Sequence, residues 1–105
     1  MRLFFDQLHV QMLPDGRVAL SVRVNDNRVD EYHLDASVVW AMLEAAAPMP
    51  GEWVGPDEVR VKFDLSKQLV GLSFAVGENK REVHRVGLSP FEVMAAQFRS
   101  QAVGG

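Results

Sequence analysis

Apolar and polar residues alternate with a period of two along residues 8–12 and 17–24. In the first stretch, Leu8, Val10 and Met12 are apolar, and His9 and Gln11 between them are polar. Such alternation is typical of a strand with one face in a core and the other in solvent. The pattern predicts strands over residues 8–12 and 17–24, and a third strand is expected over 28–34. The second half of the chain repeats this order, which predicts strands over 58–65, 69–76 and 80–86.

Turn residues separate these strands. Pro14-Asp15-Gly16 predicts a tight hairpin, because proline presets φ and glycine accepts a positive φ. Short polar or glycine-containing turns follow at 25–27, 66–68 and 77–79. The strands should therefore form two antiparallel meanders.

Two helices follow the meanders, over roughly residues 37–47 and 90–100. For the second, Ser89, Pro90 and Glu92 match a capping box, in which the serine and glutamate side chains satisfy free backbone amides. The first helix is apolar on nearly all sides, with Glu44 as its one charged residue. Such a helix is buried in a core or pressed against a partner.

The two halves of the chain repeat each other. An offset of 52 positions places Val18 over Val70 and, further along, Met42 over Met94. This periodicity predicts an α+β fold of tandem βββα units, packed with pseudo-twofold symmetry as antiparallel sheets with two helices on one side. The expected divisions are repeat one at 1–47, a linker at 48–57, repeat two at 58–100 and a flexible tail at 101–105. The residues 1–6 could extend the first strand or add another.

Length, cysteine content, hydropathy and net charge limit the classes of protein to which the chain can belong. A chain of 105 residues fits one domain with a core of its own, and the absence of cysteine fits a reducing cytoplasm. No apolar stretch is long enough to span a bilayer. The net charge is −3, so any binding of a polyanion must depend on local charge segregation.

Basic and acidic residues are separated along the chain, and the basic ones lie at outward-facing strand positions. These positions are rich in arginine and lysine, whereas most acidic residues lie in turns, the linker and the helix starts. A positive sheet face can bind the phosphates of single-stranded nucleic acid, although these could equally be ordinary solvated strand positions. The candidate nucleic-acid-binding residues are Arg17, Arg23, Arg60, Lys62, Arg81 and Arg85.

The tandem meander-plus-helix pattern resembles the fold of the Pur-alpha repeats, the Whirly proteins and the transcriptional positive-cofactor family. Within it, Arg85-Val-Gly-Leu-Ser-Pro-Phe-Glu92 is similar to the segment that leads into the helix of the positive-cofactor family. The resemblance implies binding of single-stranded nucleic acid across the sheet and assembly through the helices. Of the candidate residues, only Arg85 falls on a basic position of that motif.

No catalytic signature is present. The three histidines have no metal-ligand spacing, and Asp64 and Glu82, the one pair of carboxylates that could be drawn together, have nothing to orient them. His84 aligns with Tyr32 in the repeat, which favours a packed position with a polar tip. The sequence therefore predicts a protein that is not an enzyme, with no cofactor and no metal.

A second function from a different class is a protein-interaction or assembly module. Trp40, in the apolar helix, and Trp53, in the linker, are its candidate interface residues. Trp53 could also fill the gap between the repeats. The free edges of a six-stranded sheet would invite pairing with a second copy, so we expect a homodimer.

Overall fold

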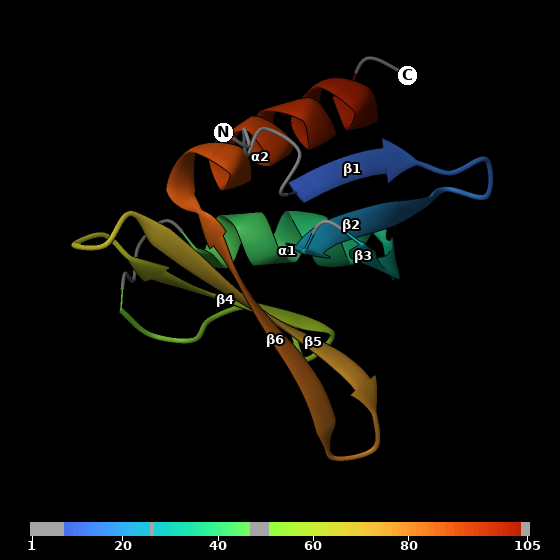
Figure 1. Cartoon of the computed structure of the whole chain (residues 1–105). Coiled ribbons are helices and arrows are strands. Elements are labelled where there is room, and N and C mark those ends of the chain that lie inside the picture. The colour runs from blue at the N-terminus through green and yellow to red at the C-terminus, as the bar shows by residue number, and fades with distance from the viewer. Residues whose placement is uncertain (1–7, 26, 47–50, 104–105) are drawn as a thin grey trace.

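The computed structural model of the chain describes residues 8–25, 27–46 and 51–103. These residues form an α+β structure in which three strands and a helix occur twice in the same order (Figure 1). The elements are β1 (Leu8–Met12), β2 (Arg17–Asn25), β3 (Arg28–Asp35), α1 (Ala36–Ala46), β4 (Val59–Asp64), β5 (Leu69–Gly77), β6 (Lys80–Gly87) and α2 (Leu88–Val103).

The strands form two separate antiparallel sheets, β1-β2-β3 and β4-β5-β6. The predicted antiparallel sheets are confirmed, whereas the six-stranded sheet assumed for the homodimer is wrong. The physical reason is that the apolar faces of both sheets contribute to a single buried core, so the sheets pack through these faces and not along an edge. The predicted alternation and strand order are confirmed in both sheets.

Each helix packs against the first strand of the other unit. α2 lies along β1, and α1 lies along β4 (Figure 1). At one of these contacts the backbone amide of Met12 donates a hydrogen bond of 3.1 Å to Oε1 of Gln101. The two units are therefore interlocked, and neither sheet is covered by its own helix alone.

The core is continuous across both units. Val39 and Met42 of α1, with Met94 and Phe98 of α2, bury their side chains among the inward-facing apolar residues of the strands. This arrangement explains the large apolar residues on one side of α1, whereas Ser37, Ala41 and Glu44 on its other side are exposed.

The inner faces of the sheets meet at Tyr32 of β3. Its ring stacks on Phe74 of β5, with ring centroids 3.8 Å apart and the planes nearly parallel. Its hydroxyl lies 2.5 Å from Oε1 of Glu82 and 2.6 Å from Nε2 of His84, both on β6. The predicted packed position of His84 with a polar tip is confirmed.

The predicted start of the second helix is two residues late. α2 begins at Leu88, whose amide donates to the carbonyl of Gln68 at 2.9 Å. Ser89 thus lies inside the helix and is not its N-cap residue. Pro90 is accommodated because the first-turn amides of a helix have no intrahelical acceptor.

The other end of α2 also differs from the prediction. The helix continues to Val103, so residues 101–103 are helical and do not belong to a tail. The predictions for residues 1–6, for the chain at 47–50 and for residues 104–105 lie outside the described residues.

Candidate functional site

The outer face of the β4-β5-β6 sheet carries a row of two cations separated by a glycine. Lys62 of β4 pairs with Gly71 of β5, and Gly71 pairs with Arg85 of β6. Because directly paired residues point to the same face of a sheet, the two basic side chains flank the bare backbone at Gly71. Within the part of the chain that the structure describes, neither Lys62 nor Arg85 forms a close ion pair, although the charge of Lys62 acts on nearby Asp64.

Trp53 adds an aromatic ring to this row. The linker that carries it is held against β4, since Gly51 donates to the carbonyl of Phe63 at 2.9 Å and Val54 exchanges two backbone hydrogen bonds with Val61. The indole thus lies over Gly71. It is so close that a Cβ added to Gly71 would lie only 2.9 Å from Cη2 of Trp53. The side chain stays 42% exposed.

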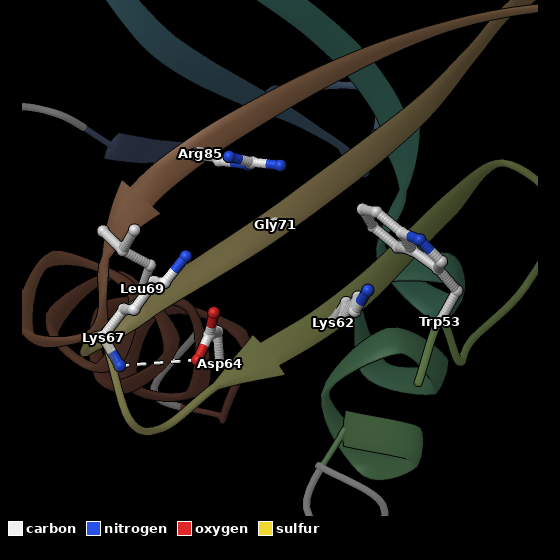
Figure 2. Close-up of a pocket in the computed structure, with 7 residues that line it drawn as sticks. All are labelled: Trp53, Lys62, Asp64, Lys67, Leu69, Gly71 and Arg85. Atoms are coloured by element: carbon white, nitrogen blue, oxygen red, sulfur yellow. Dashed lines mark hydrogen bonds between the residues drawn. The ribbon is translucent and has the colours of Figure 1, made fainter. Parts of the chain in front are cut away.

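Lys62 lies beside the same indole. Its Nζ is 5.9 Å from the ring centroid, within the range of a cation–π interaction. Together, Trp53, Lys62, Gly71 and Arg85 form what we call the Trp53 patch, shown in Figure 2. The patch combines one half-exposed ring with two positive charges.

A pocket of about 140 Å³ lies within the Trp53 patch. Lys67, Leu69 and Asp64 complete its lining on the side away from Trp53 (Figure 2). The hydroxyl of Ser66 donates to Oδ1 of Asp64 at 2.8 Å. This hydrogen bond, supported by a weaker one from the amide of Lys67, lowers the pKa of the Asp64 carboxyl, so the group is ionised at neutral pH.

Two other candidate residues on this sheet are engaged within the protein. Arg60 forms an ion pair of 2.7 Å with Asp57. Arg81 lies across β5, where its guanidinium donates to the hydroxyl of Ser73 at 2.6 Å and to the carbonyl of Ser73 at 2.8 Å. Both side chains face outward as predicted, but they are less available to a ligand than Lys62 and Arg85.

Arg17 and Arg23 lie on the outer face of the other sheet. Because the inner faces of both sheets share one core, the two outer faces point away from each other. Arg17 donates to the carbonyl of His33 at 2.9 Å and lies 3.7 Å from Asp35. The prediction of one outer surface common to all six basic residues is therefore wrong.

The two tryptophans have different environments. Trp40 packs edge-to-face on Phe98 of α2, with ring centroids 5.0 Å apart. Its ring thus joins the two helices at the margin of the core, where it is only partly buried. Trp53, expected in the gap between the repeats or at a partner interface, contributes instead to the basic sheet face. Sequence reasoning missed this, because the segment around Trp53 has no hydrophobic periodicity that would indicate pairing with a strand.

A polar cluster lies where the sheets meet. Asp30, Glu82 and His84 hold their ligand atoms within 4.8 Å of one another, a grouping that could hold a metal ion and that the sequence spacing did not indicate. Within the cluster the hydroxyl of Tyr32 donates its single proton in a hydrogen bond to the Glu82 carboxylate. Nε2 of His84 therefore donates to the Tyr32 oxygen.

Asp64 and Glu82 do not form a pair, since they lie on opposite faces of the sheet.

Comparisons with protein-family models, with curated proteins and with solved structures found no match. Among the described residues, no helix is both long enough and apolar enough to cross a membrane.

Proposed function

We propose that this protein is a small non-enzymatic binding module that binds single-stranded nucleic acid on the outer face of β4-β5-β6. The observation that carries the proposal is the Trp53 patch, with Lys62 and Arg85 on either side of Gly71 and the indole above it. Single strands are bound by a positive groove that follows the phosphates and by aromatic rings on which bases stack. The patch offers both.

The charge distribution supports the same proposal. The protein carries a net charge of −3, yet the patch brings together two cations that form no close ion pair with a described residue. Duplex DNA gives no access to the faces of its bases, so a half-exposed indole favours single strands. A cysteine-free module of this kind suits the reducing cytoplasm.

The alternative, a protein-interaction module built on the apolar helix, receives less support. The apolar side chains of α1 are used in the core, and Trp40 packs on Phe98. A homodimer formed through strand edges stays a prediction.

We also propose that the two βββα units arose by duplication and are related by a pseudo-twofold axis. β3 and β6 begin 52 residues apart, and the irregularity at Arg23/Asn25 recurs at Ala75/Gly77. Tyr32 contacts His84, its counterpart at the same offset. Counterparts contact each other in this way where a twofold axis passes between them.

Titration of fluorescent single-stranded and double-stranded oligonucleotides at several salt concentrations tests the proposed function. With two or three phosphates contacted, the logarithm of the affinity for single strands should fall with the logarithm of salt at a slope of roughly −1.4 to −2.1. The double variant Lys62→Glu with Arg85→Glu should weaken binding by at least about tenfold. No binding at low salt would refute the proposal.

Arg99→Glu, on an exposed residue of α2, makes the charge change of one substitution, so it is the matched control for the single variants Lys62→Glu and Arg85→Glu. It should bind like the unchanged protein. An equal loss in this control would mean that net charge, and not the Trp53 patch, governs the affinity.

A further inference from the structure

We propose that the pocket in the Trp53 patch binds one unpaired base, and that Asp64 selects bases carrying an exocyclic amino group. The inference rests on the proposed function and adds to it a preference among bases. It follows from the chemistry of the pocket walls, which differ at the two ends.

One end of the pocket suits the flat face of a base. The linker that carries Trp53 is held to β4 by hydrogen bonds, and the indole packs closely against the bare backbone at Gly71, which leaves the rest of its half-exposed surface for a base. A ring that is already fixed loses little entropy when a base stacks on it. Lys62 and Arg85, on either side, are placed for the phosphates that flank the stacked base.

The other end of the pocket suits the polar edge of a base. Asp64 lies across Lys62 from Trp53 (Figure 2). Its Oδ1 accepts from the hydroxyl of Ser66 and the amide of Lys67, whereas Oδ2 forms no hydrogen bond with a residue that the structure describes. One carboxylate oxygen is thus left to accept from a ligand.

An ionised carboxylate accepts hydrogen bonds and cannot donate them. It therefore attracts the amino group of cytosine, adenine or guanine and repels the carbonyl oxygens of thymine and uracil. Cytosine and thymine are similar in size, and the group at ring position 4 is an amino group in one and a carbonyl in the other. The two bases also differ at N3 and in the thymine methyl group, so the role of Asp64 is isolated by repeating the comparison in a variant of Asp64.

The experiment compares the affinities of a short oligodeoxycytidine and an oligothymidine of equal length for the full chain. We expect the cytidine oligomer to bind at least about tenfold more tightly, the lower end of the range for one hydrogen bond to a charged group. In Asp64→Asn the side-chain carbonyl can still accept from Ser66 and Lys67, while an amide that donates replaces the free oxygen. This variant should lose the preference for cytosine.

The control Asp57→Asn removes a charge from the same side of the molecule but outside the pocket, and it should keep the preference. Equal binding of the two oligomers by the unchanged protein, or an undiminished preference in Asp64→Asn, would overturn the inference and leave the proposed function standing. Failure of both oligomers to bind at low salt would overturn both.

Discussion

At position 71 the absence of a side chain decides where the Trp53 ring lies. Glycine normally weakens a strand, because it costs backbone entropy and packs nothing. Here the lost packing is replaced by the indole, which approaches β5 more closely than any side chain at this position would allow. Gly71 therefore links the conformation of the linker to the shape of the proposed binding face.

Gly71→Ala should separate binding from stability. The new methyl group would lie 2.9 Å from Cη2 of Trp53, and the half-exposed ring can move outward to relieve the contact. We expect the affinity for oligonucleotides to fall about five- to tenfold, since stacking on one ring contributes roughly 1–3 kcal/mol. The free energy of unfolding, measured in urea, should change by less than about 1 kcal/mol.

Gly77→Ala is the control in the same strand. A Cβ there would meet Lys80 at 3.8 Å, an ordinary contact, far from Trp53. Its affinity should equal that of the unchanged protein. If Gly71→Ala also bound normally, the position of the indole would not contribute to binding.

Among the elements, the contact between α2 and β1 joins the two units most directly. Oε1 of Gln101 accepts a hydrogen bond from the backbone amide of Met12. Gln97, one turn earlier in α2, is exposed and makes no such bond with a described residue. Gln101→Ala should lower the free energy of unfolding by about 0.5–1 kcal/mol, as expected for one exposed hydrogen bond. Gln97→Ala should leave it nearly unchanged. Chemical denaturation of both variants checks this, and equal effects would exclude a role for the hydrogen bond.

The strands were predictable because each one carries its own signal. Val18, Leu20 and Val22 alternate with polar or small residues, so the buried face of β2 follows from local sequence alone. The exchange of helices between the units was not predictable, because α1 has apolar side chains on nearly every side. Any face of α1 could have met either sheet, and only the tertiary packing decides between them.

Part of the candidate site was predictable, because two of its residues lie on strands that carry a local sequence signal. Lys62 and Arg85 follow from strand alternation and were placed on the correct face. Trp53 sits in a segment rich in proline and glycine, where no periodicity indicates a direction. Its position depends on backbone hydrogen bonds to β4, which leave no trace in the choice of side chains.

On the scale of the whole molecule, the two sheets are held together by an apolar core and by the polar contact at Tyr32. That side chain stacks on Phe74 and bonds to Glu82, so it joins β3 to both β5 and β6. Burial, followed by the hydrogen bond to Glu82, raises the pKa of Tyr32 well above its ordinary value. The folded protein therefore retains the phenol proton at pH values where the unfolded chain has lost it.

This difference predicts a loss of stability in alkali. The raised pKa contributes stability that is fully present below pH of about 10, where the unfolded phenol is still neutral, and that declines as the pH rises toward the folded pKa. Urea unfolding at increasing pH should show this decline, and Tyr32→Phe should remove the part due to the phenol while keeping the ring stack on Phe74. Because the chain has one tyrosine, the ultraviolet absorbance of phenolate reports its ionisation directly. Ionisation near pH 10 in the folded protein would contradict the sheet contact at Tyr32.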